Sequence, residues 1–211
     1  MYSWGTKDTN GTPYIRKMDL LMPPAYFPPI YYFSHLMGQF ETVFIDSGSN
    51  FEKQTIRNRC TILGANGIMN LIIPLKKWST HRPIDTIELN NEYKWKHTHW
   101  RSIMSAYSNS PYFQHYRPEF EQFYEREYRS LTDIDVASIQ LIMQLLKVDI
   151  SLSLRNKEHE TENIVDMTRD YSKTKCRNSP PNPPYLQVFC DRFPFTPGLS
   201  VLDLLFNLGP Q

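Results

Sequence analysis

The sequence has no long hydrophobic run, and this absence limits the kind of protein it encodes. None of its apolar segments approaches the roughly 20 consecutive apolar residues that a membrane helix needs. The N-terminal stretch MYSWGTKDTNGTPYIRK contains no apolar core like that of a secretory signal. We therefore expect a cytoplasmic protein with no membrane insertion.

Cysteine is also scarce. The chain has 3 cysteines, Cys60, Cys176 and Cys190, and no two of them form a CxxC pair. An odd number of cysteines gives no complete disulfide framework, so a reducing compartment is the simpler interpretation.

Two phosphate-binding motifs and a strong net charge are missing as well. The sequence contains neither GxGxxG nor a Walker A motif, so no standard phosphate loop is predicted and the cofactor stays unknown. The formal net charge is only +1, which gives no argument for a nucleic-acid partner.

What is present is an ordinary globular composition over 211 residues, of which 40% are hydrophobic and 21% charged. This length fits one sizeable domain with an elaboration. We divide the chain into a flexible N-terminal extension (1–17), a main α/β domain (18–150), a polar, Pro-rich linker (151–184) and a C-terminal segment (185–211) that docks on the main domain.

The main domain begins with a strand–loop–helix–strand order. The strand Met18–Leu21 runs into the stiff loop PPAYFPP, and a helix Ile30–Phe40 and a strand Glu41–Asp46 follow. This order predicts a parallel βαβ unit. Ligands of such units sit beyond the carboxyl ends of the strands, at loops such as the one that holds Tyr26 and Phe27.

The remaining elements complete an α/β fold with a mixed sheet and flanking helices. The last helix is apolar enough that it must dock on the core. The further predicted elements are a β-hairpin of Arg59–Leu63 with Met69–Leu75, a short strand Ile84–Leu89, helices over Tyr93–Tyr107, Pro118–Tyr128, Ile134–Val148 (N-capped by Asp133) and Leu199–Leu208, and a strand-like segment Tyr185–Phe189.

A cluster of cations precedes the hairpin. Lys53, Arg57 and Arg59 fall within seven residues, with Gln54 and Asn58 between them. A guanidinium group binds phosphate or carboxylate in a bidentate manner, so Arg59 with Asn58 is the leading anion-binding candidate. The alternative is that these arginines form structural salt bridges.

Four stretches, taken in order, resemble the WbqC-like protein family of bacteria. They are PPAYFPPIYYFSHL, FEKQTIRNRCTILGANGIMNLIIPLKK, HTHWRSIMSAYSNSPYFQHY and PYLQVFCDRFPFTPGLSVLDLLFNLGP. The resemblance implies a cytoplasmic bacterial protein, and relatives are often encoded with genes for O-antigen or capsule synthesis. Compared with longer family members, the segment from about 150 to 184 is short.

The resemblance also implies a set of site residues. The family's recurrent polar residues, matched by position, are Gln54, Asn58, Arg59, His99, Trp100, Tyr107, Asp203 and Asn207. From the residues themselves we expect His99 to act as general acid or base, with Tyr107 as the second catalytic residue and no metal. With Lys53 and Tyr26 added, the residues expected to bind an anionic small molecule, such as a nucleotide sugar, are Lys53, Gln54, Asn58, Arg59, Tyr26, Trp100, Asp203 and Asn207.

Several of these residues have a structural alternative. His99 could instead bond a backbone group or a neighbour, and with His97 it makes a poor metal pair because positions i and i+2 of a helix face apart. Cys60 has nearby cations that would favour a nucleophilic thiolate, but it lies in a strand pattern, and we favour a buried structural thiol.

The aromatic and C-terminal candidates each have a functional and a structural interpretation of equal weight. Tyr26 and Phe27 would either stack on a ring of the ligand or pack in the core. Asp203 and Asn207 lie four apart, hence on one face of the last helix, where they would either orient the site arginines or cap.

Three functions follow from these observations. The first is an enzyme of O-antigen or capsular polysaccharide biosynthesis that transfers an acyl or aminoacyl-type group on an activated sugar. The second is a non-catalytic binding or scaffold module of a biosynthetic complex, and the third is a nucleotide-binding transferase. The enzyme hypotheses require Arg59, His99 and Tyr26 to converge in one concave pocket; a convex arrangement favours the module.

Overall fold

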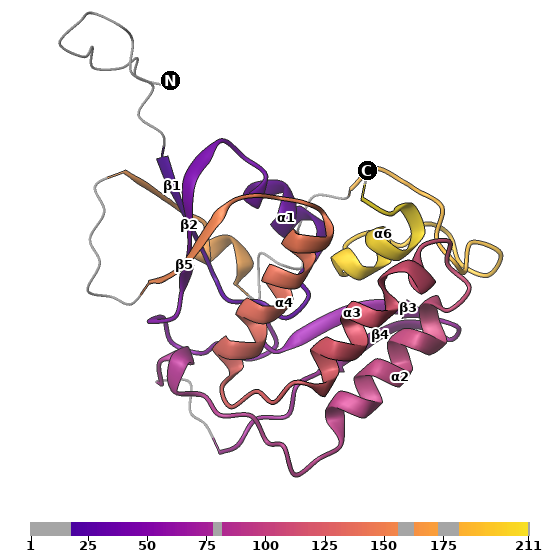
Figure 1. The fold of residues 1–211 in the computed structure, drawn as a ribbon, viewed down its shortest axis with the longest axis horizontal. Helices are drawn as coiled ribbons and strands as arrows, with labels where there is room; N and C mark the ends of the chain where they lie inside the picture. The colour runs from indigo at the N-terminus through magenta and orange to yellow at the C-terminus, as the bar shows by residue number, and fades with distance from the viewer. Residues whose placement is uncertain (1–17, 78–81, 156–162, 173–181, 211) are drawn as a thin grey trace, which may run out of the picture.

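The computed structural model describes residues 18–77, 82–155, 163–172 and 182–210. A parallel sheet of four strands lies on one side of the molecule, and the helices and a separate β-hairpin extend from it (Figure 1). The predicted extension 1–17 lies outside the described residues. None of the described helices combines the length and apolarity that crossing a bilayer requires.

The parallel sheet contains the predicted βαβ unit. β1 (Met18–Met22) leads through α1 (Ile30–Leu36) to β2 (Phe40–Asp46), which pairs with β1 in parallel. The prediction is confirmed, although α1 ends at Leu36 rather than at residue 40. Pro29, with its extended ψ of 160°, precedes the first helical turn, as a fixed proline φ favours.

Two further strands of this sheet come from the segment predicted to be a polar linker. β5 (Ser151–Arg155) pairs with β2, and β6 (Ile164–Asp166) pairs with the other edge of β1, both in parallel. The sheet order is β5-β2-β1-β6. Both are edge strands of partly exposed residues, so they lack the apolar run that marks a buried parallel strand.

The second sheet is the predicted hairpin. β3 (Arg59–Gly64) pairs antiparallel with β4 (Gly67–Ile72), and Gly64 lies opposite Gly67 across a two-residue turn. Gly67 has a φ of +103°, a conformation that side chains other than glycine's rarely adopt. The α/β class is therefore confirmed, with the parallel and antiparallel strands in two sheets.

The helix predictions hold in position and change at their ends. α2 (Trp95–Tyr107) and α6 (Val201–Leu208) match. α3 (Phe113–Glu125) starts five residues before the predicted Pro118, which lies inside the helix. α4 (Leu131–Leu145) begins after Ser130, the actual N-cap; Asp133 completes a capping box instead of capping alone.

Two predicted strands are wrong. Ile84–Leu89 contains the short 3-10 helix η1 (Ile84–Thr86) and then only isolated bridges, one of which joins Glu88 to Ser130. Tyr185–Phe189 forms no strand, and Gln187 instead bonds through its side chain to the backbone of Thr196. Alternating or β-branched residues do not form a strand where no neighbouring strand offers a ladder.

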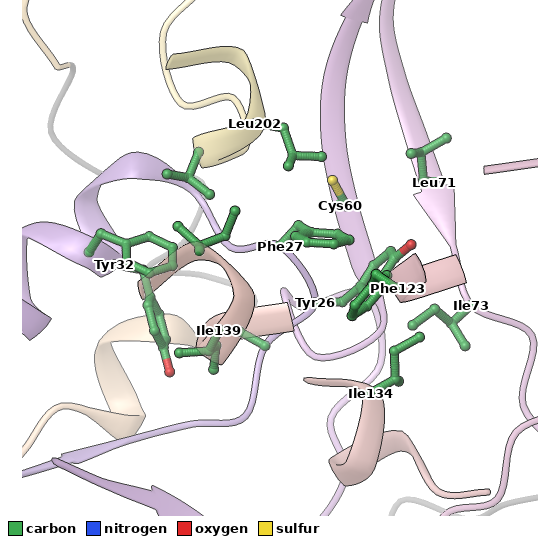
Figure 2. Close-up of a cluster of buried hydrophobic side chains, with 14 of the residues drawn as sticks. Tyr26, Phe27, Tyr32, Cys60, Leu71, Ile73, Phe123, Ile134, Ile139 and Leu202 are labelled. Carbon is green, nitrogen blue, oxygen red and sulfur yellow. The ribbon is translucent and has the colours of Figure 1, made fainter. Parts of the chain in front are cut away.

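The loop after β1 lies in the centre of the core. Tyr26 and Phe27 are fully buried, close to Cys60 of β3 and Phe123 of α3 (Figure 2). The backbone N–H of Phe27 donates to Ser138 Oγ on α4 at 3.1 Å. The core thus forms around a proline-rich loop, with the two sheets and the helices on its sides.

The C-terminal helix docks on this core, as predicted. The backbone N–H of Val201 donates to Pro28 O at 2.9 Å, so α6 begins directly against the loop after β1. The ring of Phe206 is fully buried, with centroids 5.1–5.2 Å from those of Tyr107, Phe113 and Phe120.

Phe206→Ala is expected to lower the free energy of unfolding by about 3–5 kcal/mol, because the truncated ring leaves a cavity among three aromatic neighbours. Urea denaturation measures the change. Leu186→Ala is the control: its side chain is 72% exposed, and its change should stay within about 0.5 kcal/mol. Similar losses in the two variants would contradict a docked α6.

Candidate functional site

The topology indicates where a ligand would bind. β1 is flanked by β2 on one side and β6 on the other, so the direction of the sheet connections reverses between β1 and β6. Open α/β sheets bind ligands outside the carboxyl ends of the strands at such a point. In this protein, β6 leads directly into the short 3-10 helix η2 (Thr168–Tyr171) at this point.

Aromatic side chains gather beside this reversal point. Tyr171 is fully buried and stacks on Tyr31 of α1, with ring centroids 5.2 Å apart and planes 3° from parallel. Its hydroxyl lies 2.6 Å from His35 Nδ1, also on α1. Protein groups therefore occupy the space between α1 and η2.

Residues 53–59, which we call the cationic segment, lie at the same carboxyl end of the sheet, beyond the end of β2. The backbone N–H of Tyr26, in the loop after β1, donates to Ile56 O at 2.9 Å. Two loops predicted separately to form the site, the one after β1 and the one before β3, are thus in direct contact. Lys53 and Gln54 are exposed there, and Gln54 has a φ of +60°.

Arg57 is the buried cation of this segment. It is 4% exposed, its Nη1 lies 3.7 Å from Glu52 Oε2, and the same atom donates to Thr55 Oγ1 at 3.4 Å. These contacts fit the structural role that was the alternative for the arginines.

Asn58 and Arg59 have different surroundings. Asn58 Nδ2 donates to Ile73 O at 3.3 Å, and Asn58 O accepts from Ile73 N, so this residue continues the hairpin past its last strand pair. Arg59 is half-buried, and no group in the described part of the chain accepts a hydrogen bond from its Nε. Of the two, Arg59 has the donor left for an anion.

Asp135 is a buried ionisable residue that the sequence interpretation did not single out. It is fully buried on α4, and neither of its carboxylate oxygens has a hydrogen-bond partner among the described residues. Burial raises its pKa well above the usual range, and the positive charge of Arg57 opposes this. A signal was present: Asp135 lies four residues before Ile139, on the stripe predicted to face the core.

His99 and Tyr26 meet in the interior. Tyr26 Oη lies 3.0 Å from His99 Nδ1 and 2.6 Å from Tyr124 Oη. Burial lowers the pKa of His99 to about 4, and a hydrogen bond with the Ile72 backbone opposes this shift. His99 is therefore neutral at pH 7, and the ring of Tyr26 is a core side chain in this structure.

A second buried hydrogen-bond network joins Tyr107 to the C-terminal segment. The carboxylate of Asp203 accepts from Tyr107 Oη (3.0 Å), Tyr185 Oη (2.6 Å) and Gln187 Nε2 (2.9 Å). Asn207 Nδ2 donates to the backbone oxygen of Asp203 at 2.7 Å. Burial still raises the pKa of Asp203, despite these bonds. The group holds the segment that precedes α6.

The predicted residues therefore form three groups rather than one open pocket. Neither the cleft between α2 and α3 nor the clefts lined by described residues around 76–92 and 186–192 include Arg59, His99 or Tyr26 in their lining. Trp100 stacks on Tyr124 and lines the cleft between α2 and α3.

Neither metal binding nor Cys60 chemistry gains support. Within the described ranges, no three His, Cys, Asp or Glu side chains are placed to hold a metal ion. Burial raises the pKa of the Cys60 thiol to about 12, so it is not a thiolate at neutral pH.

Asp135→Asn should make the protein more stable at pH 7. Since the folded-state pKa is raised, the unfolded chain ionises first as pH rises above about 4, and the wild type loses stability through that window. Asparagine cannot ionise, so the difference should close below about pH 4. Urea denaturation from pH 3.5 to 8 measures it, with Asp149→Asn at an exposed position as control. Lower stability of the variant at pH 7 would show that attraction to Arg57 outweighs burial.

His99 should make stability depend on pH in the opposite direction to Asp135. Because its folded-state pKa lies below the unfolded value of about 6.5, stability falls as pH drops from about 6.5 to about 4, by up to about 1.4 kcal/mol per pH unit. His99→Gln should flatten this slope, whatever its effect at pH 7. The control is His97→Gln, an exposed residue of the same helix. An NMR titration of the His99 ring with a midpoint near 6.5 would overturn the assignment.

Comparison with known proteins agrees with the resemblance found in the sequence. The profile of the WbqC-like protein family matches residues 23–187, well over half of the 211 residues. It includes three of the four resembling stretches in full and only residues 184–187 of the fourth, so α6 lies outside the match. No curated protein matches the chain, and no solved structure does. The chain belongs to the WbqC-like protein family.

Proposed function

We propose that this protein is a bacterial cytoplasmic enzyme of O-antigen or capsular polysaccharide biosynthesis, which transfers an acyl or aminoacyl-type group on an activated sugar. One observation carries the proposal: the loop after β1 and the cationic segment before β3 are in contact at the carboxyl end of a parallel sheet, through Tyr26 N and Ile56 O.

Arg59 is the proposed anchor for the phosphate or carboxylate of the substrate. Its buried Nε has no acceptor in the described part of the chain, and an anion would supply one. Lys53 and Gln54, both exposed on the same segment, would add charge and a hydrogen bond. Asn58 would support Arg59 by holding the backbone through Ile73.

In the proposed step, a hydroxyl or amine of the sugar attacks the carbonyl carbon of the acyl group. A new carbon–oxygen or carbon–nitrogen bond forms, and the proton of the nucleophile passes to a protein base. The bond to the acyl carrier breaks, and the carrier leaves with the electron pair of that bond and takes up the proton from the base. We take Asp135 as this base in preference to His99, because burial raises the pKa of the Asp135 carboxyl and lowers the His99 pKa to about 4. Catalytic roles for His99 and Tyr107 stay predictions.

The scaffold-module function remains the second candidate. It is favoured by the separation of the predicted residues into three groups, of which two are internal hydrogen-bond networks. The nucleotide-binding transferase is less well supported, because Tyr171 and Tyr31 fill space beside the point where such a ligand would sit.

The anion site is tested by thermal unfolding of the full chain with UDP-N-acetylglucosamine, acetyl-CoA or ATP. A true ligand at 100 times its Kd adds about 2.7 kcal/mol of stability, which corresponds to a rise of about 5–10 °C. We expect one probe to produce this rise, Arg59→Gln to lose it, and Arg192→Gln, a 58% exposed arginine, to keep it. Equal stabilisation of Arg59→Gln, or no shift with any probe, rejects the site.

A further inference from the structure

A cleft lies between α2 and α3, and none of its lining residues belongs to the cationic segment. Its volume is about 460 Å³, within the range of small-molecule sites. We call it the α2–α3 cleft, and its main lining residues are Tyr93, Trp95, Trp100, Glu121, Tyr124 and Glu125. The two helices run side by side in Figure 1.

Aromatic rings form much of its wall. Tyr93 is 65% exposed, a large fraction for a ring of this size. Trp100 is half-buried and stacks on Tyr124, with ring centroids 5.9 Å apart and planes 29° from parallel. Covering the face of Tyr93 removes apolar area from water, which favours a ligand that has an apolar face of its own.

The wall is also fixed in place before any ligand binds. Trp95 Nε1 donates to Asn91 Oδ1 at 3.1 Å, and Tyr124 Oη is bonded to Tyr26 Oη at 2.6 Å. Both aromatic side chains therefore have their polar ends satisfied by the protein. A rigid wall lowers the entropy cost of binding.

The charges of the cleft cancel. Lys94 and Lys96 line it with three glutamates, and Glu121 bonds Arg117 Nε at 2.8 Å. Counting that arginine, three cations face three carboxylates. Lys96 is already paired with Glu127 at 2.9 Å, while Glu125 is exposed and forms no ion pair with a described residue. This balance favours an uncharged ligand over a phosphate or an ammonium group.

We propose that the α2–α3 cleft binds an uncharged sugar ring, as the acceptor saccharide of the reaction. The C–H face of a pyranose has the partial positive charge that an aromatic face attracts, and its hydroxyls are donors for the free carboxylate of Glu125. The choice of a sugar among uncharged polar ligands rests on the proposed function. The cleft itself is independent of the cationic segment.

The test is isothermal titration of the full chain with N-acetylglucosamine, galactose, rhamnose and maltose, with tryptophan emission recorded in parallel. Trp95 and Trp100 report on the cleft directly. We expect saturable binding of at least one saccharide. Tyr93→Ala and Glu125→Gln should each weaken it at least tenfold. Because both residues are exposed, both variants should unfold at the wild-type temperature.

Matched controls are Leu186→Ala and Glu41→Gln, exposed positions outside the cleft, which should bind like the wild type. No saturable binding of any of the four saccharides, or wild-type affinity of Tyr93→Ala, overturns the proposal. Arg59→Gln should keep saccharide binding while losing the anion-dependent rise in unfolding temperature. The cleft and the anion site can therefore fail separately.

Discussion

The burial of the proline-rich loop after β1 is the constraint on which the rest of the structure depends. Its backbone is hydrogen-bonded to three parts of the fold: Tyr26 N to the cationic segment, Phe27 N to Ser138 of α4, and Phe27 O to Ser200 before α6. A buried loop needs a partner for each polar backbone group. Prolines help because they remove N–H donors and fix φ, so less entropy is lost when the loop is ordered.

The same loop brings ionisable groups into the interior. Asp135 lies on the helix that bonds the loop, His99 bonds the Tyr26 hydroxyl, and both have pKa values shifted by burial. A fully buried carboxyl with no hydrogen bond from the described residues lowers the stability of the folded state at neutral pH. Carboxyls with strongly shifted pKa values cluster at functional sites, which is why Asp135 enters the proposed reaction.

The sequence predicted elements that carry strong local patterns. The βαβ unit, the hairpin and the apolar last helix are correct because periodicity and turn residues determine them. β5 and β6 were missed because their residues are partly exposed and their pairing depends on β1 and β2. The sequence predicted the loop with Tyr26 and the segment with Ile56 at the same site, but not the hydrogen bond between them. The buried partners of His99 and Asp203 are distant in sequence, and no local pattern indicates them.

The two proposed ligand sites differ in charge, as the donor and the acceptor of the proposed transfer reaction do. The cationic segment offers Arg59 to an anion, whereas the α2–α3 cleft has balanced charges and aromatic walls. Tyr124 borders the cleft, and its hydroxyl bonds that of Tyr26, which belongs to the loop touching the cationic segment. Two hydrogen bonds of Tyr26 therefore link the borders of the two regions. An activated donor and an uncharged acceptor would each find a complementary surface, and neither surface favours the other's ligand.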